Sequence, residues 1–231
     1  MQRRLLLASA LGAAMLTLGS CGGGDAAVAA APASSDAATT LPSSTTTLLS
    51  QIEAIPVSAL STAEADALVF MREEEKLARD VYQLLYAQWG QNVFNNIASS
   101  EQQHMDAVAL LLTRYNLPDP AAGMAVGMFN DARVQDLFNT LMSQGQTSLV
   151  GALTVGATIE DLDIKDLTDR IAATDNTDIA LVFGNLMKGS RNHLRAFISQ
   201  LSGQGVTYTP QYITQEEFDA IINSPLETGS I

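Results

Sequence analysis

The segment of residues 99–104 constrains the fold of this chain more than any other. It reads Ser-Ser-Glu-Gln-Gln-His within a long helical pattern, so Glu101 and His104, three residues apart, share one helical face. Four residues that are mainly apolar lie within about 40° of His104 on that face: Ile97, Val108, Leu111 and Tyr115. A carboxylate and an imidazole on a buried face are costly without partners. The pattern therefore indicates either a water-linked polar pair between helices or a transition-metal site of the Glu-x-x-His kind found in helical bundles.

A long helix is predicted over residues 61–89, because a capping-box pattern opens it and a glycine follows it. It contains three consecutive acids: Glu73, Glu74 and Glu75. Glu75 lies at the centre of one apolar face and Glu74 at the centre of the neighbouring one, and periodicity does not choose between them. A run of acids is also typical of a solvated first half of a helix, which the helix dipole favours.

Two more long helices are predicted over residues 148–173 and 175–202. Each carries a polar group in the middle of its apolar stripe, Glu160 in the first and His193 in the second. Asp163 lies one turn after Glu160 and about 60° from the stripe centre. A second interpretation of Glu160 is a buried acid paired with one of three arginines: Arg79, Arg191 or Arg195.

The remaining pattern is helical as well. The Glu101/His104 helix is predicted over residues 93–115, and short helices near residues 131–143 and 214–223. The Gly- and Met-rich connection after residue 115 suits a crossover better than a tight hairpin. Strand signals are close to absent, so the sequence predicts an all-α fold.

The N-terminal 20 residues have the pattern of an export signal. A basic start is followed by an apolar run that is too short to span a membrane comfortably. The Leu-Gly-Ser-Cys that ends it resembles the processing site of bacterial lipoproteins, which implies a lipid-anchored N-terminus at Cys21. Gly22 after this cysteine implies the outer membrane, facing the periplasm. An ordinary secretory signal with an incidental cysteine is the alternative.

The predicted organisation is a signal peptide over residues 1–20, a flexible tether over 21–60, a helical domain over 61–223 and a tail over 224–231. Since Cys21 is the only cysteine, we expect no disulfide framework and no thiolate metal site. The formal net charge is −13, which argues against nucleic acid as a partner and suits attraction of cations.

Three segments carry a resemblance to a known family. They read Glu-Glu-Glu-Lys-Leu-Ala-Arg-Asp-Val-Tyr, Ser-Glu-Gln-Gln-His-Met-Asp-Ala-Val and Gly-Ser-Arg-Asn-His-Leu-Arg-Ala-Phe, in this order. Their spacing of acids, histidines and Tyr82 resembles the ferritin-like superfamily, including rubrerythrin-type proteins. More closely, residues 62–220 resemble an uncharacterised ferritin-like family of prokaryotic proteins, the domain of unknown function 2202.

The resemblance implies a ferritin-like four-helix bundle with a crossover connection and a buried non-haem metal site. It makes Glu75 the first-helix carboxylate, Glu101 a bridging carboxylate and Glu160 the third-helix carboxylate. The two imidazole ligands would be His104 and His193. Carboxylates with imidazoles suit iron or manganese, in one or two ions and without haem.

One position departs from the superfamily pattern. Three residues before His193, where a second bridging glutamate is expected, the chain has Ser190. Asp163 is a candidate substitute, and without one the site would hold a single ion or hold two weakly. The resemblance implies ferrous iron oxidation or peroxide reduction as the chemistry. The alternatives are a non-enzymatic metal-sequestering protein and a structural or interaction bundle, and the sequence leaves open whether the chain forms a homo-oligomer.

Overall fold

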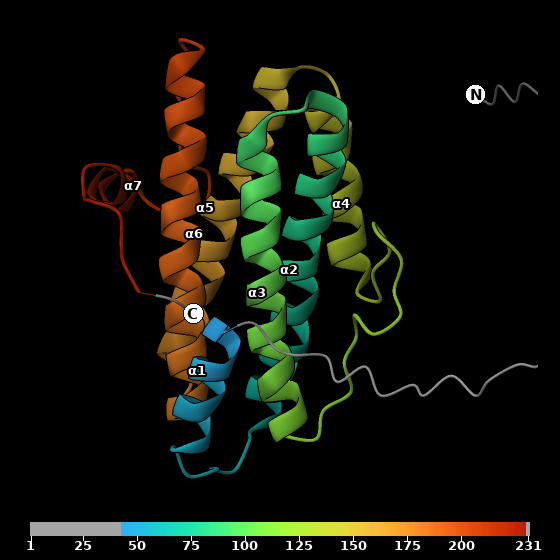
Figure 1. Ribbon diagram of the computed structural model, residues 1–231, viewed down its shortest axis with the longest axis vertical. Helices are drawn as coiled ribbons and strands as arrows, with labels where there is room; N and C mark the ends of the chain where they lie inside the picture. Colours follow the sequence, from blue (N-terminus) through green and yellow to red (C-terminus); the bar gives the residue numbers. More distant parts are fainter. Residues whose placement is uncertain (1–42, 230–231) are drawn as a thin grey trace, which may run out of the picture. The chain divides into compact units, whose positions relative to one another are not determined.

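The computed structural model describes residues 43–229. This range contains α-helices and no strand, as Figure 1 shows. The helices are α1 (Ser43–Glu53), α2 (Thr62–Trp89), α3 (Asn92–Arg114), α4 (Ala132–Gly145), α5 (Leu149–Ala173), α6 (Thr177–Gly203) and α7 (Gln215–Ile222). The all-α prediction is confirmed for the described residues. The predicted signal peptide and Cys21 lie outside them, as does the first part of the predicted tether.

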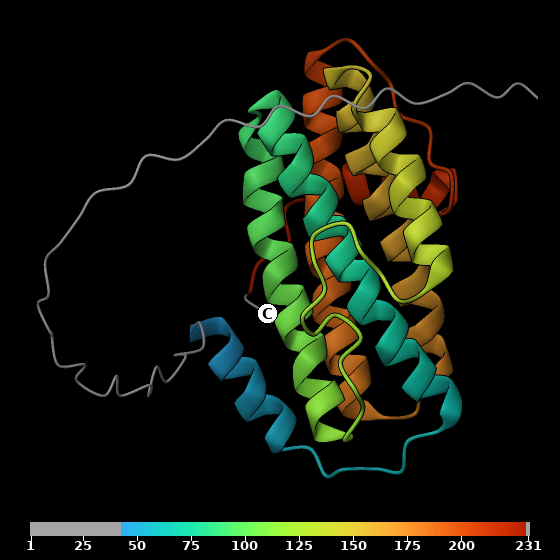
Figure 2. The same cartoon turned by 90° about the vertical axis from the view of Figure 1, so that its right-hand side faces the viewer.

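The helix ends follow their sequence signals. Ser61 and Glu64 make the reciprocal bonds of a capping box at the start of α2. Gly90 ends the helix with φ of 65°, in the left-handed region. Glycine adopts this backbone conformation readily because it has no Cβ. Because only Gly90 and Gln91 separate α2 from α3, the two helices lie antiparallel and side by side (Figure 2).

The four long helices α2, α3, α5 and α6 pack against one another. The segment that joins α3 to α4 runs back along α2, so α5 starts at the opposite end from where α3 finishes (Figure 2). Charged residues of α2 hold this segment. The Glu73 carboxylate accepts from the backbone N–H groups of Asn130 at 2.5 Å and Asp131 at 3.0 Å. Lys76 donates to the carbonyl of Ala125 at 2.8 Å.

Helix α1 lies within the range that the sequence predicted to be a tether. Leu48 and Ile52, one turn apart, are 1% exposed and pack in a core cluster that includes Leu111 and Phe183. Two apolar residues at this spacing are too few to produce a clear periodic signal. They become buried because α3 and α6 supply the surface that covers them.

The core consists of two apolar clusters. One includes Leu77, Phe94 and Phe197, and the other includes Met71, Val108 and Leu186. Every long helix contributes residues to both clusters. Buried polar residues lie between the two contributions on α2, α3 and α6, and next to the end of the first contribution on α5. We call this intervening level the polar layer, and it contains Glu75, Glu101, His104, Glu160, Asp163, Ser190 and His193.

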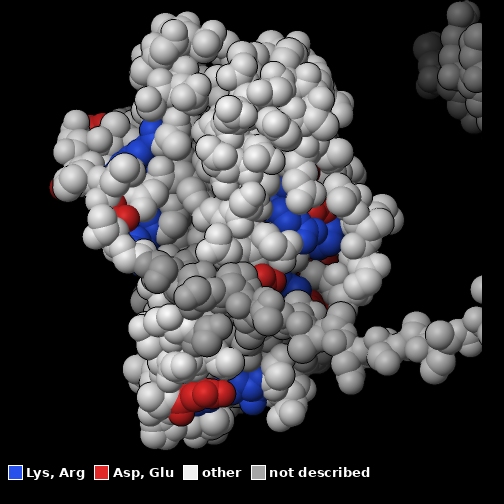
Figure 3. Space-filling model, viewed as in Figure 1, with Lys and Arg blue, Asp and Glu red and all other residues white. Residues whose placement is uncertain are grey.

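The surface shows no single dominant charged area on the face drawn in Figure 3. Basic and acidic side chains lie next to one another there, in small groups separated by uncharged surface. Among the described residues, no helix combines the length and the apolar character that crossing a membrane requires.

Candidate metal centre

The polar layer is built by four helices. Glu75 comes from α2, Glu101 and His104 from α3, Glu160 and Asp163 from α5, and Ser190 and His193 from α6. None of these side chains belongs to a residue more than 8% exposed. Ionisable groups at this depth need charged or hydrogen-bonded partners, because transfer from water penalises the charged form.

Glu101 connects the two histidines. Its Oε2 lies 2.7 Å from Nδ1 of His104, and its Oε1 lies 2.9 Å from Nδ1 of His193. The imidazole rings stack, with centroids 5.4 Å apart and planes at 26°. A carboxylate whose two oxygens face different imidazoles has the arrangement expected of a bridging ligand.

Two groups of potential ligand atoms share this carboxylate. The first half of the centre consists of Glu75, Glu101 and His104, and the second half of Glu101, Glu160 and His193. In the first half, Glu75 Oε2 lies 3.2 Å from Nδ1 of His104. In the second half, Glu160 Oε2 lies 3.4 Å from Nδ1 of His193. Two atoms that are each about 2.1 Å from one ion lie roughly 3.0–3.4 Å apart at normal coordination angles.

Asp163 is the sixth predicted site residue. It is outside both groups of potential ligand atoms, but Ser190 donates its hydroxyl hydrogen to Asp163 Oδ2. Asp163 also lines a small cavity together with Glu75, Glu101 and Glu160. The structure therefore brings an acid next to the serine that stands where the superfamily pattern has a glutamate.

Several buried atoms of these residues, all of them potential metal ligands, lack hydrogen-bond partners. They are Glu75 Oε1, Glu101 Oε1, Asp163 Oδ1 and Nδ1 of His193. Nδ1 of His193 and Oε1 of Glu101 lie close together, but the donor geometry of a hydrogen bond is not met. Lone pairs that converge in this way fit a cation between them. Four carboxylates with two neutral imidazoles would also balance the charge of two divalent ions.

In the metal-free protein, bound protons supply the positive charge that metal ions would otherwise supply to the first half. Burial raises the pKa of Glu75 to about 7, although His104 opposes the shift. Burial would lower the pKa of His104, but Glu101 and Glu75 outweigh it and hold the value well above the usual range. Burial also opposes ionisation of Glu101, and the two histidines still keep its pKa well below the usual range. This half is an ion pair beside a carboxyl group that titrates near neutrality.

The second half also holds protons in the absence of metal. Burial would lower the pKa of His193, but Glu101 and Glu160 raise it to about 10. Burial and Glu101 raise the pKa of Glu160, and burial followed by Glu75 raises that of Asp163 well above its usual range. Metal binding at such a site must displace protons, because imidazoles and carboxyls bind metal in their deprotonated forms.

The two halves are oriented by different means. In the second half, Tyr82 donates to Glu160 Oε1 at 2.5 Å, and Ser100 Oγ lies 3.0 Å from Nε2 of His193. When Nε2–H donates to the serine, Nδ1 keeps its lone pair for a metal. In the first half, Nε2 of His104 has no hydrogen-bond partner and packs against Gly189. A Cβ at Gly189 would lie 2.7 Å from Cε1 of His104 and closer still to Nε2.

The three consecutive glutamates of α2 point in different directions. They are all buried, at 2%, 5% and 2% exposure, so the interpretation as a solvated run is wrong. Glu73 binds the connection that leads to α4, and Glu75 faces His104. Both oxygens of Glu74 lack a hydrogen-bond partner, and burial followed by Asp163 raises its pKa well above the usual range.

The arginines that the sequence offered as partners of Glu160 are engaged elsewhere. Arg79 donates to Asp80 at 2.7 Å, while Arg191 and Arg195 both pair with Glu227. Glu160 instead lies among Tyr82, Glu101 and His193. The arginine interpretation is therefore wrong for the described residues.

Three supporting residues were not identified from the sequence as parts of the site. Tyr82 entered only through the spacing that resembles the ferritin-like superfamily, and the structure shows that its hydroxyl donates a hydrogen bond to Glu160. Ser100 and Gly189 carried no assigned role. The position of Ser100 directly before Glu101 is a weak sequence signal for a role in the site. The contact of Gly189 with His104 joins α6 to α3, so no local sequence pattern could indicate it.

Known proteins are similar to this chain over most of its length. Residues 64–225 match the family model described as an uncharacterised protein domain (DUF2202). The uncharacterised protein MJ0754 of Methanocaldococcus jannaschii is 52% identical over 182 residues, which is 79% of this chain and 98% of that protein.

The fold comparison agrees with the sequence comparison. The crystal structure of the hypothetical protein MJ0754 from Methanococcus jannaschii DSM 2661 matches with a TM-score of 0.74 and 53% identity, over 75% of this chain and 99% of that chain. The family model covers more than half of the chain, and the relative is matched almost completely. This chain therefore belongs to the family of the uncharacterised domain DUF2202.

Proposed function

We propose that this protein is a ferritin-like metal-binding protein with two ions of iron or manganese in the polar layer. The observation that carries the proposal is the position of Glu101 between two histidines, each accompanied by a further carboxylate. Glu75 and His104 would complete the first half, and Glu160 and His193 the second. Asp163, held by Ser190, would supply the fourth negative charge.

The surrounding residues prepare the site without taking part in binding. The apolar clusters on both sides limit the contact of the layer with water, which strengthens the electrostatic interactions in it. Tyr82 and Ser100 hold the second half by hydrogen bonds, and Gly189 leaves space for the His104 ring. Bound iron would supply redox chemistry, in the form of ferrous iron oxidation or peroxide reduction.

The proposed location is the cell envelope. It rests on the sequence of residues 1–21 alone, in which Cys21 would carry lipid and anchor the helical domain to the outer membrane, facing the periplasm. Labelling with a radioactive fatty acid in the producing cells tests it. Cys21→Ala should abolish the label and release the protein from membranes.

A second candidate function is storage or sensing of metal without catalysis. The specific observation in its favour is Ser190, which replaces a carboxylate that the superfamily pattern supplies to both ions. Turnover of peroxide by iron-loaded protein separates the two candidates. A catalyst should exceed the rate of the same concentration of free iron, whereas a binder should not.

The decisive experiment is elemental analysis. The protein is purified without a histidine tag, stripped with a chelator and reloaded anaerobically with Fe²⁺ or Mn²⁺. We expect about two ions per chain by charge balance, and a large loss in both His104→Ala and His193→Ala. A folded protein that takes up neither metal would contradict the proposal and leave a structural bundle.

A further inference from the structure

Glu74 is a buried acid that the centre itself does not use. It directly precedes Glu75 on α2, so its side chain is turned by about 100° toward α5 instead of α3. The residue is 5% exposed, and neither carboxylate oxygen has a hydrogen-bond partner. An acid in this state is expensive to keep buried, which calls for a role other than packing.

Glu74 lies on the boundary between α2 and α5, which we call the α2/α5 seam. On α5, Asp163, Asp166 and Arg170 follow one another at helical spacing on one face, and all three interact electrostatically with Glu74. Asp163 is at the inner end of this row, beside the centre. Asp166 is one turn further out.

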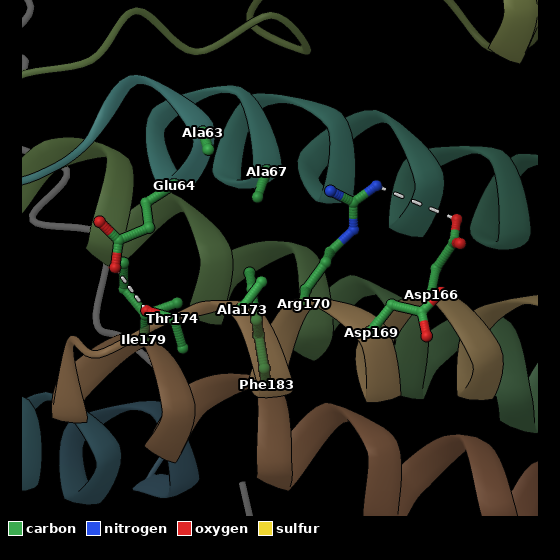
Figure 4. A pocket seen from close by; sticks show the side chains of 10 residues that line it. All are labelled: Ala63, Glu64, Ala67, Asp166, Asp169, Arg170, Ala173, Thr174, Ile179 and Phe183. Carbon is green, nitrogen blue, oxygen red and sulfur yellow. Dashed lines mark hydrogen bonds and ion pairs between the residues drawn. The ribbon is translucent and has the colours of Figure 1, made fainter.

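The outer end of the seam is hollow. A cavity of about 320 Å³ opens there between α2 and α5, bordered by the small side chains of Ala63, Ala67 and Ala173 (Figure 4). Asp166 and Arg170 extend from α5 toward α2 in this view. The two side chains form an ion pair at 4.0 Å, which is beyond hydrogen-bond distance, so a divalent cation at the mouth would compete with Arg170 for the Asp166 carboxylate.

The inner end of the seam reaches the centre. Glu74 lines the same small cavity as Glu75, Glu101, Glu160 and Asp163. Asp166, Glu74 and Asp163 therefore form a row of acids from a surface hollow to the ligands, and Glu74 is its buried middle member. Carboxylates at successive positions provide a hard divalent cation with oxygen ligands after it leaves water.

The opposite side of the centre has a different character. Between α3 and α6, a hollow of about 210 Å³ is lined by the two histidines and by Ser100, Gln103, Asn185 and Lys188, among others, with no acid. Approach of a divalent cation is favoured by negative charge. The hollow of the α2/α5 seam also contains a base, Arg170, but it is lined by three acids as well: Glu64, Asp166 and Asp169. The acids thus concentrate on one of the two seams beside the centre.

We propose that the α2/α5 seam is the path by which divalent cations reach the centre, with Glu74 as a transient carboxylate ligand between Asp166 at the mouth and Asp163 at the end. The proposal rests on the metal-binding function proposed above. It adds that Glu74 governs how fast ions arrive and not how many are held at equilibrium.

The test measures loading rate and final metal content separately. Metal-free protein is mixed anaerobically with Fe²⁺ in a rapid-mixing instrument, and free Fe²⁺ is trapped with a chromophoric chelator after set times. Glu74→Gln keeps the shape of the side chain and removes its charge, and we expect loading to slow at least tenfold with an unchanged final content. Asp166→Asn should slow it less, since the mouth is closer to solvent.

A matched control removes the same charge elsewhere. Asp219→Asn changes an exposed acid on α7 and should leave the loading rate as in the wild type. Unchanged rates in both seam variants would overturn the proposed path while the metal-binding function stands. Loss of bound ions at equilibrium in Glu74→Gln would also overturn it, because Glu74 would then be a permanent ligand. A wild-type protein that takes up neither Fe²⁺ nor Mn²⁺ would refute the metal-binding function itself.

Discussion

The two halves of the candidate centre contain the same kinds of side chain but are positioned differently. Hydrogen bonds from Tyr82 and Ser100 orient the second half. The first half depends on shape, because His104 is held against the bare backbone of Gly189 and its Nε2 has no partner. The comparison teaches that close packing against a glycine and hydrogen bonding are two different ways to position a side chain, so the halves should fail under different substitutions.

Removal of the shared carboxylate should affect both halves at once. In Glu101→Gln, the negative charge is lost and one of the two oxygens that lie within 3 Å of a histidine Nδ1 becomes an NH₂ group, which cannot bind metal. The side chain can then no longer serve both halves, so we expect the metal content to fall from about two ions per chain to nearly none. Elemental analysis after exhaustive dialysis measures this. Glu216→Gln on the exposed surface of α7 is the charge-matched control. Retention of one tightly held ion would show that the two halves do not share Glu101.

Substitution of Gly189 should separate the halves. Gly189→Ala pushes the His104 ring out of place, so the first half should lose its ion while the second half keeps its own. Metal content is expected to fall to about one ion per chain. Gly184→Ala is the control, because it lies on the same helix with nothing within 4 Å of the added Cβ. That control should keep both ions and gain up to about 1 kcal/mol of stability from helix propensity. Two ions in Gly189→Ala would contradict positioning by shape.

The halves should also differ in how metal-free protein responds to pH. The folded pKa of Glu75 is about 7 against an ordinary value of 4.5, so between these values the folded state binds more protons than the unfolded state. The stabilisation that Glu75 provides is therefore fully present below about pH 4.5. It is lost as the pH rises to 7, which lowers the free energy of unfolding by up to about 3 kcal/mol. Denaturant unfolding of chelated protein at pH 5 and pH 8 measures the loss.

The variant Glu75→Gln should reduce this pH dependence, since glutamine does not titrate. Both histidines should contribute a further loss from about pH 6.5 upward, because their folded pKa values exceed the ordinary 6.5, to about 10 for His193, so the difference between wild type and Glu75→Gln isolates the contribution of Glu75. If the free energy of unfolding of the metal-free protein rises from pH 5 to pH 8, this would contradict the conclusion that Glu75 in the first half holds a proton near neutral pH.

The smallest expected effect concerns a hydrogen bond at the edge of the second half. Ser100→Ala removes the partner of His193 Nε2, and we expect the second ion to bind about tenfold more weakly, with the first unaffected. Ser99→Ala is the control, because that exposed hydroxyl bonds only the carbonyl of Asn95 within its own helix. Competition with a chelator of known affinity resolves the two binding steps. If Ser100→Ala lowers the affinity for both ions equally, the two halves are not positioned independently.

Much of the fold could be predicted from the sequence. The long helices follow from the 3.6-residue periodicity of apolar residues and from local caps such as Ser61 and Gly90, both of which act within one or two turns. The short helix α1 could not be predicted, because its two buried residues gain their energy only from contact with α3 and α6. The same reasoning placed Glu101, His104, Glu160 and His193 on inward faces, where the structure has them.

The sequence by itself determined the helices, the inward polar residues and their chemical type, because these depend on interactions between neighbours in the chain. Only the tertiary structure decided that Glu75 faces His104 while Glu74 faces α5. It also decided that Glu101 lies between both histidines and that Asp163 bonds Ser190. These contacts join different helices, and the rotation of each helix about its axis is settled by packing of the whole core rather than by any local pattern.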